Sequence, residues 1–91
     1  MAEQFIDKES LGLIRERLWE ISNAKKITLE DIQDRTDFSY SQVYRIVRGK
    51  NNISISGLIE VCRALEIQPI EVFSFKVKIP NYPPLRKELK R

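Results

Sequence analysis

Two helix-start signals, eleven residues apart, constrain the fold more than any other feature of this chain. Thr28 is followed three residues later by Asp31, and Ser39 is followed three residues later by Gln42. A hydroxyl N-cap with an acid or amide three residues on allows two reciprocal backbone hydrogen bonds, which start a helix. Between the two helices we expect a tight turn, with Asp37 in the left-handed conformation that glycine, asparagine and aspartate tolerate best.

A helical apolar period continues on both sides of this pair. It predicts a first helix from about residue 8 or 10 to residue 25, and a fourth helix after the cap at Ser54. Pro69 suits the first turn of a short fifth helix. Cys62, a lone cysteine on an apolar face, is expected to be a core residue and not a nucleophile. The residues expected to face the core are Leu11, Ile14, Leu18, Ile21, Leu29, Ile32, Phe38, Val43, Ile46, Ile55, Leu58, Ile59, Cys62, Leu65, Ile70, Val72 and Phe73.

From residue 75 the apolar period changes from helical spacing to strict alternation. Residues 75–79 alternate apolar and basic side chains, which predicts a half-buried β-strand. A single strand cannot satisfy its own hydrogen bonds, so its expected partner is the same strand of a second subunit or the segment 4–6. Residues 85–91 are expected to form a basic tail.

Composition limits the function classes that need to be considered. The 91 residues, 42% of them hydrophobic, predict one domain, 11–74, with an N-terminal arm, 1–10, and a C-terminal strand and tail, 75–91. One cysteine and no histidine exclude a disulfide framework and the usual zinc sites, and remove the commonest general base. We therefore expect no enzyme activity, no cofactor and no metal.

The sequence also lacks the patterns that direct a chain into or across a membrane. No apolar run approaches the roughly 20 residues that span a bilayer. The N-terminus is acidic and lacks the basic start and apolar centre of a signal peptide. We expect a cytoplasmic protein with no membrane partner.

Positive charge is concentrated in two segments, although the net charge is only +3. Residues 38–52 contain three Lys or Arg and no acid, and residues 76–91 contain six Lys or Arg against a single Glu. Such segments can face a polyanion, because neutralising phosphates and releasing counterions contributes much of nucleic-acid affinity. The alternative is that these residues form an ordinary solvated surface.

Residues 14–73 resemble the phage-repressor and Cro-type (Xre-like) helix-turn-helix domain. The motifs that match are Arg17-Leu18 with Ile21, Thr28-Leu-Glu-Asp-Ile32, Ser39-Tyr-Ser-Gln-Val-Tyr-Arg-Ile46, Arg48-Gly49-Lys50, Ser54-Ile55 with Leu58, Ala64-Leu65-Glu66-Ile67, and Val72-Phe73. The resemblance implies a compact all-α domain of five helices, to which this chain adds the short β-strand and the basic tail. It also implies sequence-specific binding of double-stranded DNA as a transcriptional regulator, with repression favoured over activation.

Four positions depart from the pattern of the family that the chain resembles. Leu29 stands where many members have a glutamine that contacts the DNA backbone, and Gln33 stands where a small alanine lets the helices approach. Asp37 replaces the glycine of the turn, and Val47 replaces a frequent glutamate. None of the four interrupts the hydrophobic register.

The resemblance places the second helix of the motif in the major groove, where each base pair presents a distinct pattern of donors and acceptors. The expected base contacts are Tyr40, Ser41 and Arg45, with Arg45 bonding guanine O6 and N7 together. The expected contacts to the DNA backbone are Thr28, Gln42, Tyr44, Arg48, Lys50, Asn51 and Asn52.

A domain of this size covers few base pairs, so we expect a homodimer that binds two half-sites about one helical turn apart. The residues expected at the dimer or partner interface are Trp19, Phe75, Val77, Ile79 and Tyr82. For Trp19, packing under a terminal tail is the favoured interpretation. The basic tail could also follow phosphates or enter a minor groove. A different class of function is a protein-interaction module, such as an antitoxin or adaptor, that clamps a partner with the strand and tail.

Overall fold

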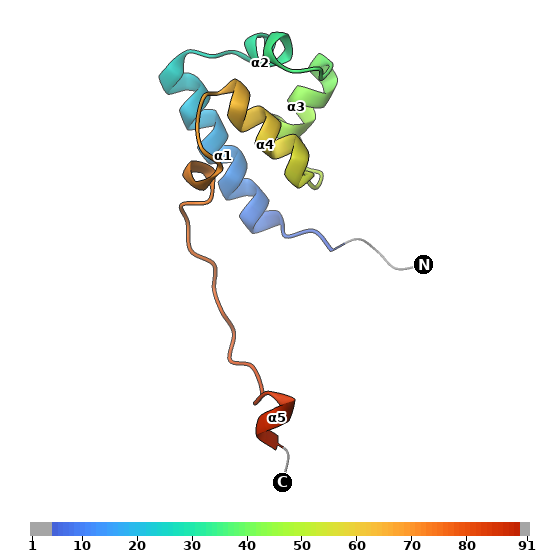
Figure 1. Ribbon diagram of the computed structural model, residues 1–91, viewed down its shortest axis with the longest axis vertical. Helices are drawn as coiled ribbons and strands as arrows, with labels where there is room; N and C mark the ends of the chain where they lie inside the picture. The colour runs from blue at the N-terminus through green and yellow to red at the C-terminus, as the bar shows by residue number, and fades with distance from the viewer. Residues whose placement is uncertain (1–4, 90–91) are drawn as a thin grey trace, which may run out of the picture.

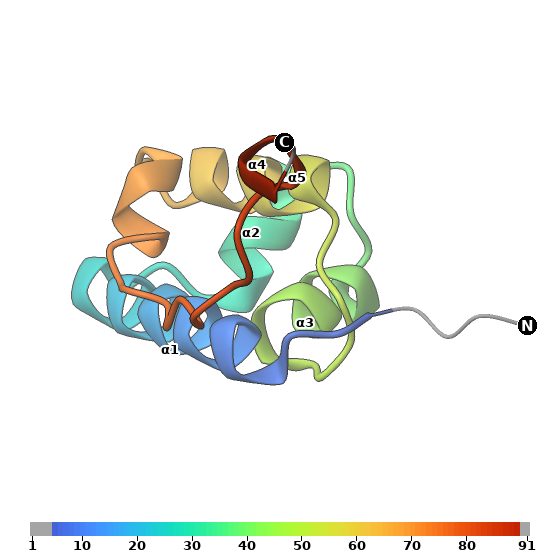
Figure 2. The same ribbon diagram turned by 90° about the horizontal axis from the view of Figure 1, so that it is seen from below.

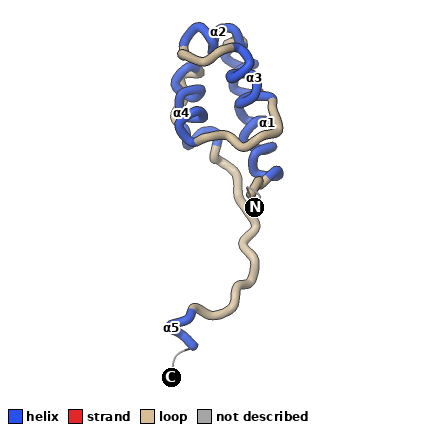
Figure 3. The backbone as a smooth tube through the Cα atoms, turned by 90° about the vertical axis from the view of Figure 1, so that its right-hand side faces the viewer, coloured by secondary structure: helices blue, strands red, loops and turns tan. Residues whose placement is uncertain are grey.

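The computed structural model describes residues 5–89, and in this range the chain consists of helices and loops (Figure 1, Figure 3). The first helix begins and ends close to the expected positions. In chain order the elements are α1 (Lys8–Lys25), α2 (Leu29–Arg35), α3 (Tyr40–Arg48), α4 (Ile55–Ala64), the 3-10 helix η1 (Pro69–Val72) and α5 (Arg86–Leu89).

Helices α1 to α4 and η1 form one body around a shared core. Figure 2 and Figure 3 place α1 and α4 on opposite sides of that body. Its interior is filled by apolar side chains. Full burial of one large apolar side chain contributes about 1.5–3 kcal/mol to the stability of the fold. The buried core residues are Ile14, Leu18, Ile21, Ile32, Val43, Val47, Leu58, Val61, Cys62, Ala64, Leu65, Ile67 and Val72.

Three residues expected in the core lie at the surface instead. Ile55 is 67% exposed at the start of α4, and Ile70 and Phe73 are exposed while Val72 between them is buried. The cause at η1 is its geometry, because a 3-10 helix has three residues per turn and turns only one position in three toward the body. The expected fifth helix is thus a single turn of this tighter kind.

The expected strand at residues 75–79 is wrong for the chain as described. Phe75 packs against the edge of the core, whereas Val77 and Ile79 are exposed on a segment that runs away from the body without regular structure (Figure 1). A strand needs a neighbour to share its backbone hydrogen bonds. Within residues 5–89 no second strand is present, and residue 4 of the other expected partner lies outside this range.

The expected left-handed turn at Asp37 is also wrong. Among the described residues, the non-glycine residues with positive φ are Lys26, at 59°, and Glu66, at 61°. After α2 the chain instead turns at Thr36, whose backbone is extended at φ −130° and ψ 174°. Thr36 Oγ1 donates to the carbonyl of Ile32 at 2.9 Å and accepts the amide of Phe38 at 3.2 Å. The hydrogen bonds of the Thr36 side chain therefore stabilise the turn, in place of a residue in the left-handed conformation.

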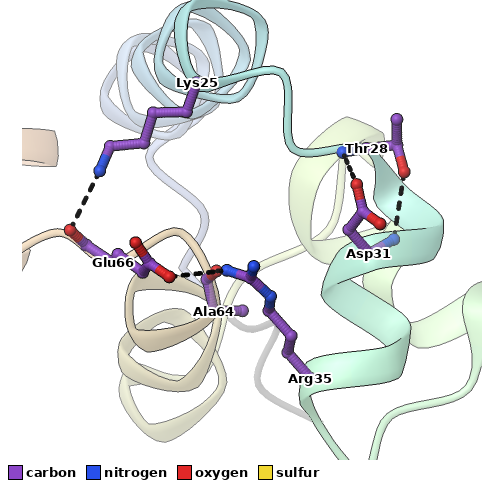
Figure 4. Close-up of polar contacts among 6 residues, drawn as sticks. All are labelled: Lys25, Thr28, Asp31, Arg35, Ala64 and Glu66. Carbon is purple, nitrogen blue, oxygen red and sulfur yellow. Dashed lines mark hydrogen bonds and ion pairs between the residues drawn. The ribbon is translucent and has the colours of Figure 1, made fainter.

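Cationic side chains from other elements hold the carboxyl ends of the helices. Arg35 Nη1 donates to the carbonyl of Ala64 at 2.9 Å and pairs with the Glu66 carboxylate at 3.1 Å (Figure 4). Lys25 Nζ donates to the carbonyl of Glu66 at 3.2 Å. Arg17 Nε donates to the carbonyl of Glu71, in η1, at 3.0 Å. Each cation satisfies carbonyls that a helix leaves without an internal partner and complements the negative end of its dipole.

Candidate nucleic-acid interface

Helix α3 begins and ends at sharply defined residues. Ser39 Oγ accepts the amide of Gln42 at 3.2 Å, and Gln42 Oε1 accepts the amide of Ser39 at 2.8 Å, so the expected capping box is present. At the other end the Gly49 amide donates to the carbonyl of Arg45. A Cβ at Gly49 would lie 2.4 Å from that carbonyl oxygen, which explains why glycine stands there. The helix between these caps is short and fixed at both ends.

The two faces of α3 differ in chemistry. Val43 and Val47 are buried, and Ile46 is half-buried against the core. The opposite face is exposed, and residues three or four positions apart are neighbours on it. Its side chains are those of Tyr40, Ser41, Tyr44, Arg45 and Arg48. The structure thus brings together the three expected base contacts and two of the expected backbone contacts on one exposed surface, with no acidic residue.

Two tyrosines stand side by side on this surface. The ring centroids of Tyr40 and Tyr44 are 6.5 Å apart and their planes are inclined by 30°. Both side chains remain about half exposed. Aromatic rings in this arrangement attract each other, which orders both side chains before a partner arrives.

The other expected backbone contacts surround α3. Thr28 forms the second expected capping box, in which its Oγ1 accepts the Asp31 amide at 3.1 Å and its own amide donates to Asp31 Oδ2 at 2.9 Å (Figure 4). These bonds lower the pKa of the Asp31 carboxyl. Asn52 Nδ2 donates to the carbonyl of Phe5 at 3.0 Å and so holds the N-terminal arm beside the loop after α3. Lys50 and Asn51 are exposed in the same loop.

Trp19 lies in a different place from the one that we expected. Its ring is 43% exposed, and the guanidinium of Arg48 lies over it with Cζ 3.6 Å from the ring centroid. The chain after η1 instead lies along another part of α1, where Phe75 and Leu13 line the same hollow. Among residues 5–89, neither terminal segment lines the hollow beside Trp19, so the favoured packing under a tail is not observed there, and its place at a dimer or partner interface stays a prediction. Trp19 belongs to the surroundings of α3.

The remaining expected interface residues lie on the C-terminal segment. Phe75 is half-buried against the core. Val77, Ile79 and Tyr82 are 56%, 72% and 74% exposed on the part of the chain that leaves the body. The structure thus separates the expected interface residues, because Phe75 belongs to the helical body and the other three to an extended arm.

Arg15 is the residue at this site that the sequence analysis missed. Its Nε donates to the carbonyl of Ile46 at 3.0 Å, and its Nη2 donates to the carbonyls of Arg45 at 3.1 Å and Asn51 at 2.6 Å. Burial lowers the pKa of this guanidinium. In the sequence Arg15 is one of several charged residues beside an apolar stripe, and its carbonyl partners are about thirty or more positions away. No local pattern distinguishes it.

A capped helix, a tight turn and a second helix with a polar, basic outer face define a helix-turn-helix protein. Residues 17–78 match the model of the Cro/C1-type HTH DNA-binding domain, and the chain belongs to that family. It is accordingly a DNA-binding domain of sequence-specific regulators. Comparison with curated proteins and with solved structures finds no match. Within residues 5–89 no helix combines the length and the apolar character needed to cross a membrane.

Proposed function

We propose that this protein is a transcriptional repressor that reads double-stranded DNA with the exposed face of α3. The observation that carries the proposal is the gathering of Tyr40, Ser41 and Arg45 on one face, free of acidic residues, of a helix capped at both ends. A helix presented in this way fits the major groove with its N-terminal residues at the base edges. A protein bound at a promoter represses by excluding other proteins from the same DNA.

Within this proposal Arg45 discriminates most strongly between sequences. A guanidinium can bond guanine O6 and N7 together, which is worth about 1–3 kcal/mol of discrimination against another base. Ser41 is a short contact that accepts several bases. Tyr40 approaches a thymine methyl or a sugar with its ring, steadied by Tyr44. The roles follow from side-chain chemistry and from the common face.

We assign the phosphate contacts that position α3 on the duplex to residues at its carboxyl end and in the neighbouring segments. Arg48 and Lys50 supply charge to phosphates at the carboxyl end of α3, and Tyr44 and Asn51 supply neutral donors. Thr28, whose Oγ1 accepts the Asp31 amide, places its hydroxyl at the start of α2 as a further phosphate contact. Gln42 and Asn52 are partly engaged within the protein, by the Ser39 cap and the Phe5 carbonyl. We assign these two a minor share of the phosphate contacts.

Binding to duplex DNA at several salt concentrations tests this proposal. We expect the logarithm of the association constant to fall linearly with the logarithm of salt, with a slope of about −0.9 per neutralised phosphate. Lys50→Ala should make the slope shallower by about one such unit. Arg63→Ala is the matched control, since its side chain is exposed on α4 and pairs with Glu60. A salt-independent affinity would contradict DNA binding.

We further propose that the protein binds DNA as a homodimer, because two copies of α3 one helical turn apart cover two half-sites. The exposed apolar residues of the C-terminal arm, Val77, Ile79 and Tyr82, are the proposed contacts of the second subunit. Sedimentation with and without DNA tests this assignment. We expect a dimer for the whole chain and a monomer after deletion of residues 75–91. A single copy on DNA carrying two half-sites would contradict it.

The C-terminal arm also supports a second candidate, a protein-interaction module such as an antitoxin or adaptor. The observation in its favour is that apolar and basic side chains alternate on a segment that leaves the body (Figure 1). In that case, deletion of residues 75–91 would abolish binding of the partner protein, while Arg45→Ala and high salt would leave it intact. DNA as the principal target predicts instead that affinity falls steeply with salt and that Arg45→Ala weakens binding to one site preferentially.

A further inference from the structure

The stacked pair of Trp19 and Arg48 joins α1 to the last turn of α3. The guanidinium lies over the indole with Cζ 3.6 Å from the ring centroid, within the range where the ring attracts a cation. This contact uses the flat face of the guanidinium. Its N–H donors point outward in the plane of the group, so they remain available to an acceptor at its edge. The ring therefore steadies Arg48 without occupying its donors.

A hollow of about 370 Å³ adjoins this pair. Among the residues that line it are Trp19, Asn23, Lys26, Thr28 and Arg48, and the lining includes two cations and no acid. Thr28 borders the hollow, and its side-chain oxygen accepts the Asp31 amide. The Asp31 carboxylate, which does not line the hollow, accepts the Thr28 amide.

The backbone at Lys26 is a second unusual feature of this hollow. Lys26 ends α1 with φ 59° and ψ 35°. Residues other than glycine, asparagine and aspartate rarely adopt this left-handed conformation. Its amide donates to the carbonyls of Asn23 and Ser22, which keeps the turn closed. This turn places a lysine in the lining of the hollow that Arg48 also borders.

We propose that this hollow is a phosphate subsite of the DNA interface, and that Trp19 is a positioning residue that aims Arg48 at a phosphodiester oxygen. The inference rests on the proposed function. Arg48 is three positions after Arg45 on the exposed face of α3, so a duplex read by Arg45 brings its backbone toward Arg48. Arg48 and Lys26 then supply cationic donors from α3 and from the end of α1 to one phosphate. Trp19 itself touches Arg48 and need not touch DNA.

A double-mutant cycle on the whole chain tests the role of Trp19. The variants are Trp19→Leu, Arg48→Ala and the two together, with Arg63→Ala as a control outside the site. We expect Trp19→Leu to weaken binding to a mixed-sequence duplex by about two- to fivefold, the size of an exposed cation–π contact. In the Arg48→Ala background the same substitution should have no effect. Trp19→Phe, which keeps a ring under the guanidinium, should restore most of the affinity.

Two further readouts separate positioning from a general structural role. Arg48→Ala should reduce the steepness of the salt dependence by about 0.9, as expected for one lost phosphate contact, whereas Trp19→Leu should leave it unchanged. Since Trp19 is the only tryptophan, its fluorescence reports on the hollow directly. We expect duplex DNA to shield it from acrylamide in the wild type.

The outcomes also distinguish this inference from the function on which it rests. Additive losses from Trp19→Leu and Arg48→Ala, or an unchanged salt dependence in Arg48→Ala, would overturn the subsite while the wild type still binds DNA. Unchanged quenching of Trp19 in the complex would overturn it as well. Failure of the wild type to bind any duplex in a salt-dependent way would overturn both proposals.

Discussion

The Nε–H of Arg15 donates a hydrogen bond to the carbonyl oxygen of Ile46 at 3.0 Å, and the same guanidinium reaches the carbonyls of Arg45 and Asn51. One side chain of α1 therefore closes the last turn of α3 and fixes the loop that follows. Helix α3 leaves the Ile46 carbonyl without an internal partner, so a cation from outside satisfies it, and the Arg45 carbonyl accepts the Gly49 amide as well. The exposed face of α3 is thus held in place by a residue of another helix.

Replacing Arg15 tests this bracing. A lysine keeps the charge but offers a single donor group in place of the planar fork, so Arg15→Lys leaves carbonyls unsatisfied. We expect a loss of about 1–3 kcal/mol in the free energy of unfolding, measured by urea denaturation. Arg63→Ala, which removes an exposed ion pair, should cost less than about 1 kcal/mol. Equal losses for the two variants would contradict the role of Arg15.

Two glycines of the chain should respond to alanine in opposite directions. At Gly49 a Cβ would lie 2.4 Å from the Arg45 carbonyl oxygen, whereas at Gly12 it would meet nothing within 4 Å. Gly12→Ala should stabilise the protein by up to about 1 kcal/mol, because alanine favours the helix interior. Gly49→Ala should destabilise it by about 1–3 kcal/mol through the forced shift of α3. Thermal unfolding of both variants measures the sign of each change in stability. A stabilising Gly49→Ala would contradict the close approach of residue 49 to the Arg45 carbonyl.

The thiol of Cys62 should be inert in the folded protein. Cys62 is 1% exposed, and burial, with a smaller contribution from the charge of Glu71, raises the pKa of its thiol. The thiolate is the reactive form, so both effects slow modification. We expect a thiol reagent to label Cys62 only as fast as the protein unfolds, with full labelling in denaturant. Rapid labelling under native conditions would show that the core is open at α4.

The capping box of α2 should make part of the stability depend on pH. Hydrogen bonds from Thr28 lower the pKa of Asp31 below its ordinary value in the folded state. The folded protein therefore binds the proton of Asp31 less readily than the unfolded chain does. The stabilisation is complete above the unfolded pKa of about 3.9 and is lost as pH falls through the lower folded pKa.

Asp31→Asn measures this contribution. We expect the wild type to be more stable than the variant at pH 7, and the difference between their free energies of unfolding to shrink as pH falls below about 4. Urea denaturation of both proteins across that range provides the comparison. A difference that grows toward acid pH would have the wrong sign for a carboxylate held in its charged form.

Local chemistry predicted those elements that depend on neighbouring residues. The capping boxes at Thr28 and Ser39 and the buried side chain of Cys62 were expected and are present. Each depends on residues within one or two turns of the chain, where spacing along the sequence determines spacing in space. The same holds for the exposed face of α3, which follows from the helical period alone.

The features that the sequence did not predict are contacts between distant residues and, at one turn, a choice between two local alternatives. The turn after α2 uses the side chain of Thr36, whose two hydrogen bonds compete with the left-handed alternative at Asp37. Trp19 of α1 contacts Arg48 of α3, and Arg15 of α1 donates to carbonyls of α3 and of the loop that follows it. At residues 75–79 the alternating pattern favours a strand but cannot supply the neighbouring strand that a sheet requires.

The central claim is that the α3 face reads base sequence, and Arg45 is its sharpest test. The measurement is selection of bound sequences from a random duplex pool with the wild type, Arg45→Ala and the Arg63→Ala control. We predict that the wild type and the control recover the same preferred sequence, and that Arg45→Ala loses the preference for guanine at one position per half-site, about 1–3 kcal/mol of discrimination. Recovery of no preferred sequence by the wild type, or of an identical sequence by Arg45→Ala, would contradict the claim.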